Sequence, residues 1–339
     1  MQRELSVGPL LNRYGNLNEA GYATELVKEY NRKHIKAPKG RIKEWDYYYV
    51  GTPHYGVALT IADNSYMGLL SVTFLDFVKG QETTKSVMLW FTWGKLHLPS
   101  TSKSGNVIVN HKDMRIAFMN DGLKRILQCE IPDFSKGTPF SCHIELSNPS
   151  KDSMVIATPF PKAKHFYYNQ KINCLEGAGW VKVGDSNYDF ASSLGVLDWG
   201  RGVWTYRNTW YWSSLSVRLG EDFVGFNLGY GFGDTSAASE NMLFLNGQAT
   251  KIDEVRFKIP TNDKGEDDYL SPWTITDSDG LVNLTFEPIL DRHSNTSALV
   301  IASNQHQVFG KFSGTLNCQE KVIHLKDALG FAEKVMNKW

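Results

Sequence analysis

The stretch from Gly195 to Ser214, GVLDWGRGVWTYRNTWYWSS, constrains the fold more than any other part of the chain. From Trp204 onward its even positions carry mostly aromatic side chains, whereas its first odd positions are polar. A two-residue period is that of a β-strand, so the stretch predicts a strand with one aromatic face. Gly200 and Gly202 flank Arg201, which predicts a tight turn or bulge that aims the arginine.

Charged side chains lie among these rings, above all Asp198 and Arg201. Charges are rarely buried without a partner or a purpose, so the combination favours a ligand pocket. The alternative is an aromatic sheet face on which Asp198 and Arg201 form a structural ion pair. In the pocket interpretation, the wall contains Trp199, Tyr206, Trp210 and Trp212.

Short strands and turns follow one another through most of the chain. Asn120-Asp121-Gly122, Asn246-Gly247 and Asp279-Gly280 are hairpin signals between apolar runs. Few helical patterns separate these runs, which is typical of an antiparallel all-β fold. The same architecture is expected in both halves, as two β-barrels.

Two segments have helical periodicity. Residues 18–34 place apolar side chains three and four apart, and so do residues 325–339. The proline-containing stretch 149–164 fits a domain boundary there or slightly later. We therefore expect an N-terminal extension and helix (1–40), a first barrel (41–170), a second barrel (171–324) and a C-terminal helix (325–339).

Composition excludes several classes of function. The 36 Lys and Arg residues balance the 36 Asp and Glu residues, so nucleic acid is not an expected partner. No run approaches the length of a membrane span, and the N-terminus lacks a signal-peptide core. The dispersed cysteines fit reduced thiols in a cytoplasmic protein. Neither metal-ligand spacing nor a nucleotide fingerprint is present, so we expect no metal and no cofactor.

Two further groups of residues are candidates for the pocket. The strand from Gly225 to Gly233 alternates small residues and Asn227 with bulky apolar ones, so its bare face admits a ligand or another strand. A carboxyl group beside rings can become an acid near neutral pH, which makes Asp46 a candidate. The candidate site residues around these two features are Trp45, Asp46, Tyr47, Tyr49, His54, Tyr55, Glu240, Asn241, Trp273 and His306.

Several motifs resemble those of the domain-of-unknown-function family 2804. They are Asp198-Trp-Gly-Arg-Gly202, Trp210-Tyr-Trp212, Lys43-Glu-Trp-Asp-Tyr-Tyr48, Phe226-Asn-Leu-Gly229, Glu240-Asn241 and His306-Gln-Val-Phe-Gly310. The likeness covers nearly the whole chain. That family is similar, more distantly, to the carotenoid hydratase and tocopherol cyclase superfamily, which implies a pair of lipocalin-like (calycin) barrels.

The walls of Trp and Tyr predict a cavity for a small, largely apolar ligand, isoprenoid- or lipid-like. If the protein is an enzyme, the resemblance implies acid-initiated hydration or cyclisation of a carbon–carbon double bond. Asp198 or Asp46 would give the proton, and His54 or Arg201 would hold the quenching nucleophile. Arg201 also suits an anionic substrate group. Two alternatives stay open: a non-catalytic lipocalin-like carrier and a carbohydrate-active protein. The sequence does not specify an oligomeric state.

Overall fold

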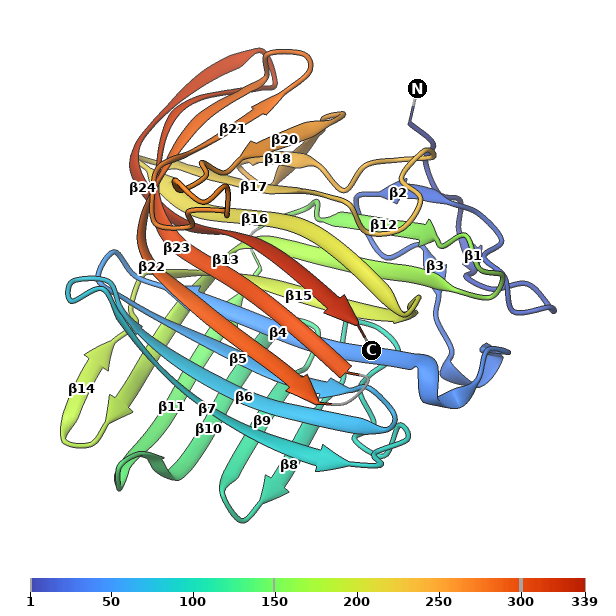
Figure 1. The fold of residues 1–339 in the computed structure, drawn as a ribbon, viewed down its shortest axis with the longest axis horizontal. Helices are drawn as coiled ribbons and strands as arrows, with labels where there is room; N and C mark the ends of the chain where they lie inside the picture. Colours follow the sequence, from blue (N-terminus) through green and yellow to red (C-terminus); the bar gives the residue numbers. More distant parts are fainter. Residues whose placement is uncertain (1, 149, 299–300, 339) are drawn as a thin grey trace.

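Two large, curled antiparallel sheets make up the protein (Figure 1). The computed structural model describes residues 2–148, 150–298 and 301–338. The first sheet has 13 strands and the second has 9. The all-β prediction is confirmed, and each sheet has the form of a half-barrel. Among the described residues, no helix has the length and apolar character needed to cross a membrane.

The first sheet has the spatial order β7-β6-β5-β4-β15-β13-β11-β10-β9-β8, with β12, β2 and β14 joined to β13 or to each other. Its concave face encloses a large apolar core that includes Val50, Leu127 and Trp199. Its strands are β2 (Gly21–Ala23), β4 (Ile42–Gly51), β5 (Tyr55–Asp63), β6 (Met67–Asp76), β7 (Gln81–Trp90), β8 (Val107–His111), β9 (Met114–Asn120), β10 (Lys124–Ser135), β11 (Thr138–Ser147), β12 (Met154–Pro159), β13 (Phe166–Val183), β14 (Ser186–Asp189) and β15 (Ser193–Val203).

The second sheet has the order β19-β18-β17-β16-β24-β23-β22-β21-β20. Phe226, Trp273 and Phe312 belong to its own core. Its strands are β16 (Arg207–Leu219), β17 (Asp222–Tyr230), β18 (Met242–Leu245), β19 (Gln248–Lys251), β20 (Val255–Lys258), β21 (Trp273–Asp277), β22 (Val282–Ala298), β23 (Ile301–Cys318) and β24 (Lys321–Lys338).

A third set of buried side chains lies between the two sheets. Tyr47 and Tyr49 of β4 meet Trp212 of β16, Phe309 of β23 and Phe331 of β24. The ring centroids of Tyr49 and Phe309 are 5.1 Å apart, and those of Trp212 and Phe331 are 4.8 Å apart. Successive side chains of a strand point to opposite faces. Strand β4 therefore sends odd-numbered residues to this interface and even-numbered ones into the first core.

The two predicted terminal helices are wrong. Residues 18–34 form β2, the two-residue strand β3 (Lys28–Glu29, paired with β1, Gly8–Pro9) and the 3-10 turn η1 (Arg32–His34). The apolar residues of this segment cover the first core as an irregular strap. Residues 325–338 lie in β24, which pairs with both β16 and β23. Trp339, the last residue of the predicted helix, lies outside the described residues.

The chain passes from the first sheet to the second between Val203 and Arg207. The predicted boundary after residue 170 falls inside β13, which pairs with β15 from Phe166 to Gly177 and with β11 from Glu176 to Val183. The predicted start of a separate C-terminal element at residue 325 falls inside β24. Residues 204–206 connect the two sheets, whereas the predicted boundary lies within a strand of the first sheet.

Candidate functional site

A cavity of about 210 Å³ lies between the two sheets. The first sheet contributes β4, β5, β6, β13 and β15, and the second contributes β16, β22, β23 and β24. Asn64, between β5 and β6, and residues in the connections that contain Trp204 and Phe232 complete it. The lining residues are Trp45, Tyr47, Thr60, Ala62, Asn64, Leu69, Ser71, Tyr167, Lys171, Asp198, Trp204, Trp210, Trp212, Phe232, Glu240, Arg292, Ser303, Gln305, Gln307, Glu333 and Asn337.

Aromatic rings form one wall of the cavity. The Trp45 ring stacks on Tyr167 at 6.0 Å and meets Trp204 edge-on at 5.1 Å. Phe232 lies edge-on to Trp204 and Trp210, with centroids 4.8 and 5.2 Å away. Edge-to-face pairs of this kind fix ring orientation. The wall is therefore a preformed surface for an apolar ligand.

Glycine makes room for this wall. A Cβ at Gly200 would overlap the indole of Trp45, so β4 and β15 can carry that indole only because residue 200 has no side chain. Strand β15 runs through Gly200 and Gly202 in unbroken register with β4. The predicted turn or bulge at Arg201 is therefore wrong.

The Asp198 carboxylate points into the cavity and is held by three donors. Lys171 Nζ lies 3.0 Å from Oδ1, Asn169 Nδ2 lies 2.6 Å from Oδ1, and Trp45 Nε1 lies 3.1 Å from Oδ2. The Lys171 ammonium also sits 3.7 Å above the Trp212 ring. Asp198 and Lys171 thus form a buried ion pair inside an aromatic surround.

Glu333 is a second carboxyl group in the cavity. Trp210 Nε1 donates to its Oε1 at 3.0 Å, and Gln307 Nε2 donates to its Oε2 at 3.1 Å. Gln307 Oε1 accepts from Arg292 at 3.0 Å and from Tyr47 at 3.3 Å. Burial raises the pKa of Glu333 to about 7, outweighing the Trp210 hydrogen bond and the nearby cations. Glu333 can therefore hold or release a proton near neutral pH.

Glu240 is a third buried carboxyl group, and desolvation raises its pKa as well. Its main-chain carbonyl accepts from Asn227 Nδ2 at 2.7 Å, while Asn227 Oδ1 accepts from Trp212 Nε1 at 2.7 Å. Asn241 Oδ1 accepts from the Gly229 amide at 2.6 Å. Asn227 and Asn241 are thus positioning residues for the loop that carries Glu240.

The bare face of β17 is occupied by protein. A Cβ at Gly225 would meet Cys174 Sγ at 2.8 Å, and one at Gly229 would meet the Glu240 carboxyl carbon at 2.9 Å. Of the two expected occupants of this face, a ligand or another strand, the structure shows the approach of β13 at Gly225. The glycines let the two sheets come close beside the cavity.

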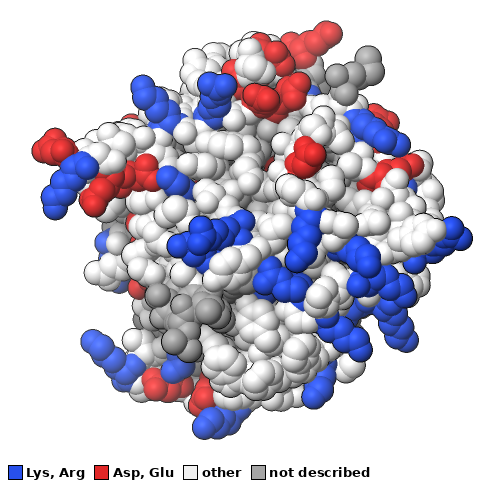
Figure 2. Space-filling model, turned by 45° about the vertical axis from the view of Figure 1, so that its right-hand side comes forward, with Lys and Arg blue, Asp and Glu red and all other residues white. Residues whose placement is uncertain are grey.

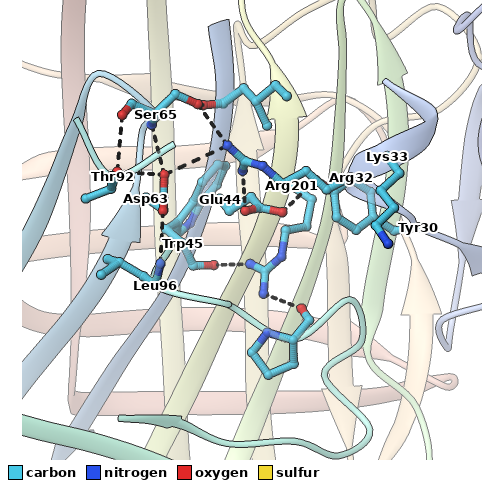
Figure 3. Close-up of polar contacts among 12 residues, drawn as sticks. Tyr30, Arg32, Lys33, Glu44, Trp45, Asp63, Ser65, Thr92, Leu96 and Arg201 are labelled. Atoms are coloured by element: carbon cyan, nitrogen blue, oxygen red, sulfur yellow. Dashed lines mark hydrogen bonds and ion pairs between the residues drawn. The ribbon is translucent and has the colours of Figure 1, made fainter. Parts of the chain in front are cut away.

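Asp198 and Arg201 do not form an ion pair. An odd spacing on a continuous strand places them on opposite faces. Arg201 is fully buried in the first core, where it donates to Asp46 at 2.9 Å and to the Pro99 carbonyl at 2.7 Å. It also donates to the Trp45 carbonyl at 2.7 Å (Figure 3). Its guanidinium lies 4.3 Å above the Trp199 ring. Asp46, Trp199 and Arg201 are thus structural residues of the first core.

The structure brings six predicted residues to the cavity: Trp45, Tyr47, Asp198, Trp210, Trp212 and Glu240. The others lie elsewhere, for reasons of strand parity or loop position. His54 and Tyr49 line a separate groove between the sheets; Tyr55 packs on Phe74 and Tyr188; Tyr206 is exposed; Trp273 belongs to the second core; and His306 stacks on Tyr269 and pairs with Asp291.

Three lining residues that give the cavity much of its charge were not predicted from the sequence: Lys171, Arg292 and Glu333. Glu333 lay in the segment predicted as a helix. If that segment is interpreted as a strand, Glu333, Val335 and Asn337 lie on one face. This two-residue period in the sequence could have identified Glu333. Within the described part of the chain, no group of three or more His, Cys, Asp or Glu residues is arranged to hold a metal ion.

The model of a family described as a domain of unknown function (DUF2804) matches residues 2–339. No curated protein matches the chain in sequence. A solved structure from Nitrosomonas europaea, assigned as an AttH, is 13% identical, with a TM-score of 0.55 over 90% of this chain and 95% of that one. Kievitone hydratase from Nectria haematococca is 11% identical, with a TM-score of 0.53 over 98% of each chain. At these identities the likeness is one of fold.

Proposed function

The chain belongs to the DUF2804 family, and from this premise we propose that its inter-sheet cavity binds a small, largely apolar molecule and protonates a carbon–carbon double bond. Glu333 is the proton donor, and the product is the hydrated or cyclised molecule. The observation that carries the proposal is a buried carboxyl group with a pKa near 7 in a cavity walled by indole rings. A general acid works best when its pKa lies near the working pH.

The aromatic wall supports the second step. Protonation of an alkene leaves a positive charge on carbon, and the faces of Trp and Tyr rings stabilise a cation. Trp45, Trp204 and Trp210 supply such rings, whereas Lys171 covers one face of Trp212. We place the developing cation on the Trp204 and Trp210 side of the cavity, away from the Lys171 ammonium.

The atoms balance with water as the nucleophile. Glu333 gives its proton to one alkene carbon, forming a C–H bond and a cation on the other. A water oxygen then forms the C–O bond and gives a proton to the Asp198 carboxylate, which Lys171 and Asn169 orient. Solvent then takes up the proton from Asp198 and returns a proton to Glu333, which restores both groups. In a cyclisation, a nucleophile within the substrate takes the place of water.

Size and charge limit the substrate. An apolar cavity of about 150 Å³ holds benzene, so a cavity of about 210 Å³ suits one ring with substituents. Lys171 and Arg292 both line it, which suits a phenolate, enolate or carboxylate oxygen on the ligand. Kievitone hydratase shares the fold and by its name catalyses a hydration, which supports this reaction class by analogy.

The test begins with native mass spectrometry of the purified protein, followed by organic extraction of any bound ligand. Turnover of that ligand in D₂O should place deuterium on carbon. Glu333→Gln should retain the ligand and lose deuterium incorporation by a factor of about 10² or more. Glu287→Gln, an exposed glutamate on β22 of the same sheet, is the matched control and should change neither.

Other results would replace the proposal. A ligand that wild-type protein holds without any exchange or conversion indicates the carrier alternative. A bound sugar indicates the carbohydrate-active alternative. Full deuterium incorporation by Glu333→Gln would remove Glu333 from the role of acid.

A further inference from the structure

Three large aromatic side chains stand exposed at the end of β7. Trp90 is 65% exposed, Phe91 61% and Trp93 46%. The rings of Phe91 and Trp93 stack with centroids 6.5 Å apart. Clustered exposed rings of this size are unusual on a protein surface and mark an interaction site.

The fold holds these rings outward at a cost. Phe91 and Trp93 have φ values of 55° and 51°, which bulky residues rarely adopt. The Phe91 amide donates to the Tyr66 carbonyl and the Trp93 amide to the Ser65 carbonyl, both at 2.9 Å. Between them, Thr92 Oγ1 donates to the buried Asp63 carboxylate at 2.8 Å (Figure 3). The exposure is therefore built into the fold and is not a loose loop.

A basic segment lies against this loop. Arg32 lies beside Gly94 and also donates to Ser65 Oγ at 2.9 Å, and Trp93 lies beside Gly40. Residues 31–43 and 83–100 contain no Asp or Glu. Their exposed lysines are Lys33, Lys36, Lys39 and Lys95. Figure 2 shows a face on which Lys and Arg side chains gather across the middle and lower right, whereas most acidic side chains lie toward its edges.

The aromatic end of β7 borders the cavity. Met88, 42% exposed, is the cross-strand partner of Leu69, which lines the cavity. Trp90 is the partner of Met67 on the same face. In the basic segment, Arg41 donates to the carbonyl of Trp204, another lining residue, at 2.9 Å.

We propose that Trp90, Phe91 and Trp93 with Lys33, Lys36, Lys39 and Lys95 form a docking surface for an anionic lipid bilayer. Tryptophan is the residue that favours the bilayer–water interface, and clustered lysines are attracted to anionic headgroups. Lysine is depleted in protein–protein interfaces, so exposed rings next to a segment rich in exposed lysines favour a lipid surface over a second copy of the chain. Docking would place the cavity beside the membrane, and it does not depend on the chemistry proposed for the cavity.

The experiment is co-sedimentation with vesicles of phosphatidylcholine, with and without phosphatidylglycerol. Wild-type protein should bind the vesicles that contain phosphatidylglycerol and be released by high salt. Each lysine near an anionic surface contributes about a fivefold factor in affinity, so Lys33→Glu with Lys39→Glu should weaken binding more than about tenfold. Trp90→Ser with Phe91→Ser should abolish binding, because both rings are needed for insertion.

Trp180 and Lys182 provide matched controls. They are an exposed tryptophan and an exposed lysine on β13, outside the proposed surface. Trp180→Ser and Lys182→Glu should leave vesicle binding unchanged. Quenching of wild-type tryptophan fluorescence by brominated phosphatidylcholine in mixed vesicles tests insertion without any variant.

Three outcomes would overturn the inference. They are absence of wild-type binding to any vesicle, binding that the surface variants and the controls affect equally, and a concentration-dependent dimer in light scattering that Trp90→Ser with Phe91→Ser dissociates. The last would identify a second copy of the chain as the partner.

Discussion

Glu333 couples the stability of the fold to pH. Burial raises its pKa from the ordinary 4.5 to about 7. Between these values the native protein binds more protons than the unfolded chain, so the free energy of unfolding falls as pH rises. The contribution is fully present below pH 4.5 and is lost as pH rises through about 7. Between pH 4.5 and about 7, the free energy of unfolding of wild type should fall by about 3 kcal/mol relative to that of Glu333→Gln. Urea unfolding at each pH measures this difference.

The comparison with Glu333→Gln isolates that effect. Burial also raises the pKa of Asp46 and Glu240, but both groups are present in the two proteins and cancel in the difference. Lys43 and Lys251, whose pKa values burial lowers to about 7, act mainly above this window. A difference in stability that stays constant from pH 4.5 to 7 would contradict the assignment.

The ion pair of Asp198 and Lys171 gives a second prediction. Both side chains are almost fully buried, and their charged atoms are 3.0 Å apart. Lys171→Met leaves a buried carboxylate without its counter-ion and should destabilise the protein by about 3–5 kcal/mol. Adding Asp198→Asn should restore most of that loss, as measured by thermal unfolding of the single and double variants. If the destabilisation of the double variant equals the sum of those of Lys171→Met and Asp198→Asn, the two side chains are not energetically coupled.

Strand parity explains why residue types were easier to predict than their roles. The sequence indicated that Asp198, Trp210 and Trp212 belong to one aromatic strand system, and all three line the cavity. It also suggested a bulge at Arg201, and without that bulge the arginine falls on the opposite face. A β-bulge inserts only one extra residue into a strand, and glycine permits a bulge but does not require one. Gly200 and Gly202 alone therefore could not decide whether Arg201 lies in a bulge.

At the scale of elements, β24 is where local pattern and tertiary context disagree. As a helix, the segment would place Val335 and Met336 on one buried face. As a strand, it buries Val335, 1% exposed, and leaves Met336, 41% exposed, on the other face. Val335→Ala should therefore cost about 1–2.5 kcal/mol and Met336→Ala well under 1 kcal/mol. Equal costs in chemical unfolding would contradict the strand.

Hairpins were predictable because their signals are local. Asn246-Gly247 joins β18 and β19 at the expected residues, and Asn120-Asp121-Gly122 joins β9 and β10. The terminal segments carry apolar residues at spacings that fit a helix. Their partners, β2 with β12 and β24 with β16 and β23, are distant in sequence. A short stretch of sequence carries no information about strand partners that are distant in the chain. In the terminal segments, pairing with these partners therefore overrides the local helical pattern.

At the scale of the whole molecule, the cavity exists only because two sheets meet. Its lining runs from Trp45 to Asn337, and neither sheet encloses it alone. The sequence predicts a cavity but does not indicate whether it lies in one barrel or between the two. The position of the cavity depends on which face of β4, β15 and β16 meets the other sheet. Both faces of these strands carry apolar residues, so only the packing of the sheets determines that position.

The rings between the sheets should make the two sheets unfold together. Phe309 of β23 is fully buried, and its ring centroid lies 5.1 Å from that of Tyr49 in β4 and 5.7 Å from that of Phe77, the residue after β6. Phe312, three residues on and equally buried, contacts Phe226 and Phe286 within the second sheet. Each change to alanine should cost about 3–5 kcal/mol.

Of these two variants, only Phe309→Ala should make the two sheets unfold at different urea concentrations. In hydrogen exchange at stepped urea concentrations, peptides from β10 and β21 of the wild type should lose protection together. Phe312→Ala should lower that urea concentration for both peptides alike, because the rings between the sheets remain. Phe309→Ala should make the two peptides lose protection at different concentrations. Loss of protection at one shared concentration in Phe309→Ala would mean that the sheets are coupled by the cavity residues rather than by this ring cluster.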